Sequence, residues 1–278
     1  MKINLDIRIV SLALNIKVLM LLQKELEIAL KAARAGARVV LENFGKSKES
    51  RVKGDAKGLV TATDLASEKA ILEVLSTESG YEIMSEESGT LHHSFGPKWV
   101  VDPLDGTNNF ARSLPFFAVS VGLMDGNDSL VGVIIDVVGN KEYYAIKGGG
   151  AFCNGEKIIQ PVFDKNYIPM LFLNHGYAET DRAKFKKLAD LLASDFNILK
   201  LGTTALELCY IASGAVDGFI CSGDELWDFA AGIVIAKEAG CIFTDWKGNP
   251  WDGTNSHLLI ARHEIHSLLA SKTKYFQI

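Results

Sequence analysis

Two aspartates in the stretch WVVDPLDGTNNF are the residues best suited to chemistry. An apolar run leads into Asp102 and Asp105, which stand three positions apart in a predicted tight turn at the end of a strand. Their carboxylates and the carbonyl oxygen of Leu104 are hard oxygen ligands of the kind that Mg²⁺ prefers. Gly106 and Thr107 follow at a predicted helix start, where free backbone N–H groups bind anions. The stretch therefore combines metal ligands with a phosphate cradle, although Asp-Pro-x-Asp-Gly is also a good turn sequence by itself.

Three further acidic residues lie in short motifs that each have an ordinary structural explanation. Glu86 follows the strand-like run YEIMS, and glutamates at a strand end are usually solvated. Asp228 in LWDFAAG stands in the first turn of an apolar helix, where a carboxylate favours the helix dipole. Asp64 in VTATD is placed to cap a helix that begins at Leu65. Each explanation is adequate alone, but the motifs occur together in one chain.

Hydrophobic spacing predicts the elements that must position these residues. An apolar stripe from Leu26 to Phe44 predicts a helix that ends at Gly45. The runs FFAVSVGLM, LVGVIID and EYYAIKG, separated by short turns, predict an antiparallel meander. Strand and helix patterns then alternate to the end of the chain, which is typical of an α/β arrangement. We expect an N-terminal extension or extra helix at 1–22, an α+β metal-binding half at 23–158 and an α/β half at 159–278.

Composition excludes several classes of protein. The chain has 278 residues, 48% hydrophobic and 23% charged, with a formal net charge of −5, so it is neither disordered nor a good duplex nucleic-acid binder. Its four cysteines form no CxxC pair, which argues against zinc and disulfide frameworks and favours a cytoplasmic location. The run IVSLALNIKVLMLL is too short for a membrane span and is interrupted by Lys17. We expect translation to begin at Met20, where an amphipathic segment starts.

Taken together, the four motifs resemble the inositol monophosphatase family, part of the lithium-sensitive, Mg²⁺-dependent phosphatase superfamily. Its signature D-P-[LI]-D-G-[TS]-x-N-[FY] is matched by DPLDGTNNF, and its W-D-x-x-A-[AG]-G corresponds to WDFAAG, which is one residue shorter. The family's T-x-x-D appears as TATD and its G-E-E as SEE. Its E-A-G-G appears as EAGC, where Cys241 replaces a frequent glycine. The resemblance covers nearly the whole chain from about Met20.

The resemblance implies a layered α-β-α-β-α sandwich and a phosphomonoesterase that uses two to three Mg²⁺ ions. One ion would be held by Glu86, Asp102 and the Leu104 carbonyl, and a second by Asp102, Asp105 and Asp228. Thr107, hydrogen-bonded to Asp64, would orient the attacking water. The implied substrate contacts are Gly106, Thr107, Gly202, Thr203 and Asp228, and Lys53 falls where the family has a mobile-loop lysine.

The substrate is left open by the sequence. In inositol-specific members a glutamate contacts sugar hydroxyls, and Cys221 stands at that position here. A thiol does not replace a carboxylate as a hydrogen-bond acceptor, so Asp224 or Glu225 would have to supply that function. Inositol monophosphate is the leading candidate substrate, and fructose 1,6-bisphosphate is the next. Adenosine 3′,5′-bisphosphate and histidinol phosphate are further alternatives. A non-enzymatic binding partner is the alternative from another class, and family members commonly form homodimers.

Overall fold

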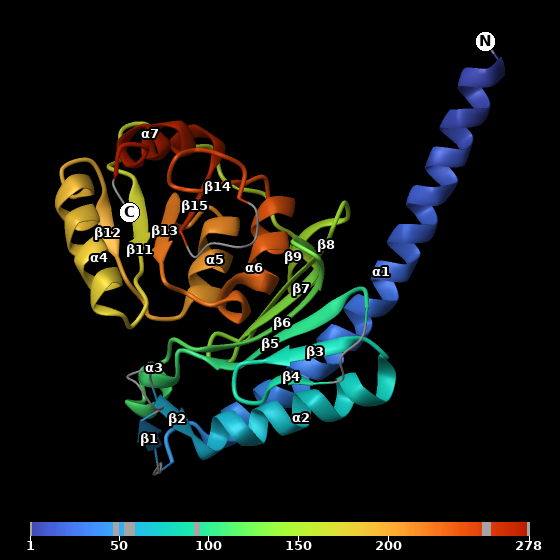
Figure 1. Cartoon of the computed structure of the whole chain (residues 1–278), viewed down its shortest axis with the longest axis horizontal. Coiled ribbons are helices and arrows are strands. Elements are labelled where there is room, and N and C mark those ends of the chain that lie inside the picture. The colour runs from blue at the N-terminus through green and yellow to red at the C-terminus, as the bar shows by residue number, and fades with distance from the viewer. Residues whose placement is uncertain (1, 47–49, 53–58, 92–94, 252–256, 277–278) are drawn as a thin grey trace.

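The computed structural model of the chain describes residues 2–46, 50–52, 59–91, 95–251 and 257–276. For residues 2–18, 50–52 and 59 it describes the backbone alone. Two sheets of eight and five strands alternate with three layers of helices (Figure 1). This arrangement confirms the expected α-β-α-β-α sandwich, and it places the predicted site residues at strand ends and helix starts between the layers.

The first helical layer is a pair of packed helices on the outer face of the larger sheet. They are α1 (Lys2–Asn43) and α2 (Ala62–Glu78), joined through the small hairpin of β1 (Ser50–Val52) and β2 (Leu59–Thr61). Alanines 29, 32 and 33 of α1 are fully buried, as are Ile71 and Leu75 of α2. Small residues on one helix face let α1 approach α2 and the sheet closely, so α2 is held where its first turn reaches the acidic motif.

The eight-stranded sheet has the order β10-β9-β8-β7-β6-β5-β3-β4. Its strands are β3 (Glu82–Ser85), β4 (Gly89–Leu91), β5 (Lys98–Asp105), β6 (Ala118–Asp125), β7 (Asp128–Asp136), β8 (Lys141–Ile146), β9 (Gly150–Cys153) and β10 (Glu156–Lys157). Strands β6, β7 and β8 pair antiparallel in sequence order, which confirms the predicted meander. The short helix α3 (Thr107–Ala111) follows β5 directly, as the sequence predicts.

The five-stranded sheet has the order β12-β11-β13-β15-β14 and is mixed, because β15 runs antiparallel to both of its neighbours. Its strands are β11 (Met170–Leu173), β12 (Asn197–Leu199), β13 (Gly218–Ser222), β14 (Ile242–Thr244) and β15 (His257–Ala261). Helices α4 (Glu179–Leu192) and α7 (His263–Thr273) bury Leu188 and Leu269 against its outer face. The predicted alternation of strands and helices in this half is therefore confirmed.

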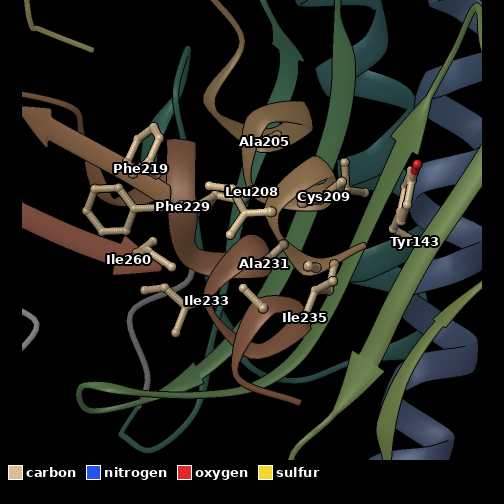
Figure 2. Close-up of a cluster of buried hydrophobic side chains, with 14 of the residues drawn as sticks. Tyr143, Ala205, Leu208, Cys209, Phe219, Phe229, Ala231, Ile233, Ile235 and Ile260 are labelled. Atoms are coloured by element: carbon tan, nitrogen blue, oxygen red, sulfur yellow. The ribbon is translucent and has the colours of Figure 1, made fainter. Parts of the chain in front are cut away.

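The central layer consists of α5 (Thr204–Ala212) and α6 (Leu226–Glu238), which lie between the two sheets. Figure 2 shows Leu208 and Cys209 of α5 among Ala231, Ile233 and Ile235 of α6 in the apolar cluster that fills this layer. Helix α6 lies so close to the larger sheet that a Cβ atom added at Gly132 would be 2.3 Å from the Ala231 carbonyl oxygen. The glycine therefore permits the contact that brings the first turn of α6 to the end of β5.

The N-terminal segment continues helix α1 without a break, from Lys2 through the predicted boundary at residues 22 and 23. Figure 1 shows the first turns of α1 projecting past the edge of the larger sheet. None of the helices in the described ranges combines the length and the apolar character needed to cross a membrane. The division into halves at residues 158 and 159 and the start at Met20 stay predictions.

Candidate active site

The carboxylates of Asp102, Asp105 and Asp228 form a compact acidic cluster. Each carboxylate has one oxygen that lies within 4.8 Å of one oxygen of each of the other two. Asp102 and Asp105 come from the end of β5, and Asp228 comes from the first turn of α6, more than a hundred residues further along the chain. Asp102 and Asp105 are buried, at 1% and 8% exposure. The structure therefore brings together three of the predicted metal ligands.

A bulge at the end of β5 sets the two neighbouring aspartates at their spacing. Asp102 pairs with Ser120 of β6 and Asp105 with Ala118, so three steps on β5 match two on β6. The predicted tight turn is therefore wrong, because β5 continues to Asp105 with one extra residue in its register. Proline cannot donate to the ladder, and Pro103 falls inside this irregular stretch. The Leu104 N–H instead donates to Asp102 Oδ1 over 3.0 Å, which fixes that carboxylate against its own strand.

The other two carboxylates of the cluster are held by backbone and hydroxyl donors. Asp105 Oδ2 accepts hydrogen bonds from Thr203 Oγ1 and from the Ala205 N–H, both over 2.7 Å. Asp228 Oδ2 accepts one from the Glu225 N–H over 2.7 Å, across the start of α6. Each donor occupies one oxygen of its carboxylate and orients the other. The predicted substrate contact Thr203 is therefore seen here as a partner of Asp105.

Burial and the charges of nearby carboxylates raise the pKa of every carboxyl group in the cluster. For Asp102 burial acts first, followed by the charges of Glu86, Asp105 and Asp228, and its pKa lies well above the ordinary range. Burial raises the pKa of Asp105 to about 7 against the lowering effect of the Thr203 hydrogen bond. The pKa of Asp228 is raised by burial and by Asp224. Anionic oxygens packed this closely are unfavourable by themselves and form a donor set that fits hard divalent cations.

Glu86 lies within range of the cluster, since its charge contributes to the raised pKa of Asp102. Its backbone N–H donates to the Val101 carbonyl over 3.1 Å, which continues the β3–β5 pairing past the end of β3. Glu68 of α2 was not among the predicted site residues, and its buried carboxylate accepts the N–H groups of Glu87 and Ser88 over 3.2 and 3.0 Å. The signal was present, because Glu68 follows Asp64 by four residues and therefore shares its helix face.

Thr107 and Asp64 are in contact as predicted, although they stand 43 positions apart in the chain. The Thr107 hydroxyl oxygen lies 2.8 Å from Asp64 Oδ1 and 3.0 Å from the Leu104 carbonyl oxygen. A hydroxyl has one proton, so it donates to one of these acceptors at a time. The contact ties α3 to α2 beside the acidic cluster.

The helix-cap interpretation of Asp64 is wrong in detail. Helix α2 begins at Ala62, three residues before the predicted start, and its N-cap is Thr61. Asp64 is the third helical residue, and its Oδ2 accepts the Thr61 N–H over 2.9 Å and the Thr61 hydroxyl over 2.5 Å. This reciprocal capping box leaves Oδ1 for Thr107. Burial raises the pKa of Asp64, while the Thr61 hydrogen bonds lower it.

Gly106 starts α3 in a conformation that suits glycine. Its φ of 89° lies in the left-handed region, and a Cβ atom there would be 2.8 Å from the Phe116 carbonyl oxygen. Gly202 has a φ of 76° in the turn that leads into α5. The Asn109 side-chain amide of α3 donates to the Leu201 carbonyl over 2.8 Å and so joins these two turns. The predicted substrate contacts Gly106, Thr107, Gly202 and Thr203 are thereby gathered along one side of the acidic cluster.

The residues considered for substrate choice differ in their surroundings. The Cys221 side chain is fully buried in β13 within the central apolar cluster. The Asp224 carboxylate accepts a hydrogen bond from Thr204 Oγ1 over 2.8 Å, and its charge raises the pKa of both Asp105 and Asp228. Glu225 is exposed. Lys53 and the loop around it lie outside the described residues.

Comparisons with known proteins agree with this geometry. The model of the inositol monophosphatase family matches residues 21–276. The fructose-1,6-bisphosphatase/inositol-1-monophosphatase of Aquifex aeolicus is 34% identical over 265 residues, covering 92% of this chain and 98% of that protein. The Nus factor SuhB of Pasteurella multocida is 33% identical, covering 89% and 94%.

A solved structure shows the same fold. The extragenic suppressor protein suhB from Bartonella henselae superposes with a TM-score of 0.84 at 27% identity, covering 90% of this chain and 98% of that one. The family match extends over nearly the whole chain and includes every motif that carries the acidic cluster. The chain belongs to the inositol monophosphatase family and is a phosphoric monoester hydrolase.

Proposed function

We propose that the protein is a Mg²⁺-dependent phosphomonoesterase that hydrolyses a small phosphorylated polyol or sugar, with inositol monophosphate as the leading substrate. The observation that carries the proposal is the cluster of Asp102, Asp105 and Asp228, two of them buried and one half-buried, each with an oxygen within 4.8 Å of the others. Their raised pKa values mark a site that a cation stabilises. The matched family supports hydrolysis as the reaction.

The same residues define where two to three Mg²⁺ ions would be held. Glu86, Asp102 and the Leu104 carbonyl are proposed as one ligand set, and Asp102, Asp105 and Asp228 as another. When bound, paired divalent ions neutralise the phosphate and stabilise the attacking and leaving oxygens of an in-line displacement. Positive ions in this cluster also explain how a chain of net charge −5 binds an anionic substrate.

The water that attacks phosphorus would be oriented by Thr107 and Asp64. When Thr107 Oγ1 donates its proton to Asp64 Oδ1, the lone pairs of Oγ1 are available to accept a hydrogen bond from that water. As the water proton passes to Thr107 Oγ1, the hydroxyl proton passes to Asp64 Oδ1. Burial raises the pKa of Asp64, which makes its carboxylate a better acceptor for that proton.

The substrate phosphate would be held by the backbone at the start of α3 and by the facing turn. Gly106 and Thr107 would supply N–H groups beside the acidic cluster, and Gly202 and Thr203 of the adjoining turn would complete the contacts. Asp228 would contact the sugar or polyol as well as a cation. We also assign the segment around Lys53 to the site, on the resemblance to the family's mobile-loop lysine.

We propose Asp224 as the carboxylate that accepts hydrogen bonds from substrate hydroxyls. Its charge reaches Asp105 and Asp228, and one of its oxygens accepts a single hydrogen bond from Thr204. Glu225 is exposed, and its side chain and backbone N–H are both engaged in a reciprocal capping box with Asp228. Asp224→Asn should therefore lower kcat/KM for inositol monophosphate by about tenfold, the scale of one hydrogen bond to a charged group, and fructose 1,6-bisphosphate hydrolysis should change less.

A phosphate-release panel tests the function. The panel contains inositol monophosphate, fructose 1,6-bisphosphate, adenosine 3′,5′-bisphosphate and histidinol phosphate, each assayed with Mg²⁺ and again with EDTA. We expect Mg²⁺-dependent release that is fastest with inositol monophosphate. Release that persists in EDTA would contradict the metal assignment, and a faster alternative substrate would correct the substrate.

A binding role is the second candidate, because one relative is a Nus factor. No phosphate release from any of the four substrates, at any Mg²⁺ concentration, would favour it. From the family resemblance and the cysteine pattern we further propose a cytoplasmic homodimer that binds neither nucleic acid nor membranes. Light scattering during size-exclusion chromatography tests the oligomeric state.

A further inference from the structure

Glu207 is a fully buried carboxyl group near the acidic cluster and outside its ligand set. It lies in the first turn of α5. Its Oε1 accepts the N–H groups of Leu201 and Gly202 over 2.7 and 3.2 Å, and the Asn174 side-chain amide donates to its Oε2. Oε1 therefore holds the turn between β12 and α5, while Oε2 holds Glu207 itself to Asn174 in the protein interior.

The turn that Glu207 fastens is the one that holds Asp105. Thr203 Oγ1 and the Ala205 N–H both donate to Asp105 Oδ2, each over 2.7 Å. Because two donors occupy Oδ2, Oδ1 is the oxygen that Asp105 offers to a cation. A shift of the turn would move both donors together and rotate the carboxylate.

The charge state of Glu207 suits this position. Burial raises its pKa to about 8, so the side chain is mostly neutral at pH 7. A neutral carboxyl group accepts backbone N–H bonds and adds little negative charge beside Asp105. An apolar side chain in its place would leave the N–H groups of Leu201 and Gly202 without this acceptor.

We infer that Glu207 is a positioning residue for the cation site, which holds the turn at residues 201–205 so that Thr203 and Ala205 orient Asp105 toward Asp102 and Asp228. The inference rests on the proposed function, because it takes the acidic cluster as a Mg²⁺ site. Direct hydrogen-bond partners of a metal ligand change metal affinity when they are lost, and Glu207 fixes the turn that carries two such partners of Asp105.

Calorimetric titration of the metal-free protein with Mg²⁺ alone tests the role. Glu207→Leu should weaken Mg²⁺ binding about tenfold, the lower end of the range for losing a direct partner of a metal ligand, because it displaces Thr203 and Ala205 together. Glu207→Gln should restore affinity close to that of the original protein, because its carbonyl accepts the same N–H groups. Its amide would donate to Asn174 Oδ1, which is buried and without a partner among the described residues, once the Asn174 side-chain amide turns over and exchanges the positions of Nδ2 and Oδ1. Phosphate release measured against Mg²⁺ concentration should show the same order.

Glu238→Leu is the matched control. The Glu238 carboxylate also accepts two backbone N–H groups of one turn, those of Gly148 and Gly150, over 2.7 and 2.8 Å. It lies at the opposite end of α6 from Asp228. Its loss should lower the free energy of unfolding and leave Mg²⁺ affinity unchanged.

The outcomes separate the two proposals. Equal Mg²⁺ affinity of Glu207→Leu and the original protein, or an equal loss in Glu238→Leu, overturns the positioning role alone. If Glu207→Leu fails to fold, Glu207→Asp takes its place, since it keeps the carboxyl group one methylene short of the turn. Unchanged affinity there also overturns the role. No Mg²⁺ binding by the original protein overturns the proposed function and the role of Glu207 with it.

Discussion

At the scale of single residues, Asp102 is the most constrained group of the site. It is 1% exposed, and its pKa is raised by burial and by the charges of Glu86, Asp105 and Asp228. It is proposed as a ligand to both ions, so we expect Asp102→Asn to lower kcat more than about 100-fold. The same change removes a repelled charge, so thermal unfolding in EDTA should move to higher temperature. Normal turnover at saturating Mg²⁺ would mean that the ligand assignment is wrong.

The contact between Thr107 and Asp64 gives a second prediction at this scale. Thr107→Ala should lower kcat about 10²–10⁴-fold with a much smaller effect on KM, because it removes help given to the attacking water and leaves the phosphate contacts in place. Asp64→Asn should act on the same step. The double variant should therefore lose much less than the product of the two single losses. Fully multiplicative losses would leave Asp64 with a capping role alone.

At the scale of elements, the start of α2 couples helix stability to the site. Thr61 accepts the Thr63 N–H over 3.2 Å and donates its hydroxyl to Asp64 Oδ2. Thr61→Ala should lower the free energy of unfolding by about 1 kcal/mol, the usual effect of losing an N-cap. It should also raise the pKa of Asp64, because it removes the Thr61 hydroxyl hydrogen bond that lowers this pKa and leaves the backbone one. Urea unfolding measures the loss of stability, and kcat measures the effect of the change in Asp64 on turnover.

Thr61→Ser keeps the hydroxyl and serves as the matched variant for that test. It should retain most of the stability and most of the turnover. A Thr61→Ala protein with lowered stability and unchanged kcat would show that the cap supports the helix without supporting Asp64.

At the scale of the whole molecule, the site makes stability depend on pH and on metal. Folding raises the pKa of Asp105 to about 7 and that of Glu207 to about 8, from values near 4 in the unfolded chain. The contribution of these groups to stability is therefore greatest below about pH 4, where both are protonated in either state. That contribution is lost as pH rises through the folded values, because the unfolded chain releases its protons first. In EDTA the protein should therefore be more stable at pH 5.5 than at pH 8.5.

Mg²⁺ should reverse that loss at pH 8.5. A cation that binds the folded protein and not the unfolded chain raises the free energy of unfolding in proportion to the logarithm of its concentration. Urea titrations at both pH values, with EDTA and with Mg²⁺, measure the effect. Equal stability at the two pH values in EDTA would show that the acidic cluster is not strained when it is empty of cations.

Those features of the protein that depend on local chemistry could be predicted from its sequence. Hydrophobic periodicity predicted the meander β6–β8 and the alternating second half, because burial of one face imposes a period on each element. The motifs around Asp102 and Asp228 predicted an acidic site and the family, since the types and order of residues are properties of the chain itself. The continuous helix α1 and the bulge in β5 were not predicted, because each depends on what packs or pairs alongside.

Tertiary structure decided which of those residues meet and how they are held. Asp228 joins Asp102 because α6 packs against the larger sheet at Gly132, a contact that no local pattern encodes. Glu68 and Glu207 are ordinary helix glutamates in the sequence, and folding places their oxygens on the loop after β3 and on the turn before α5. The raised pKa of Glu207 follows from its burial, and the role of Glu68 follows from partners about twenty residues further along the chain. The sequence alone determined the kinds of groups in the site, and the packing of the layers decided their distances and charges.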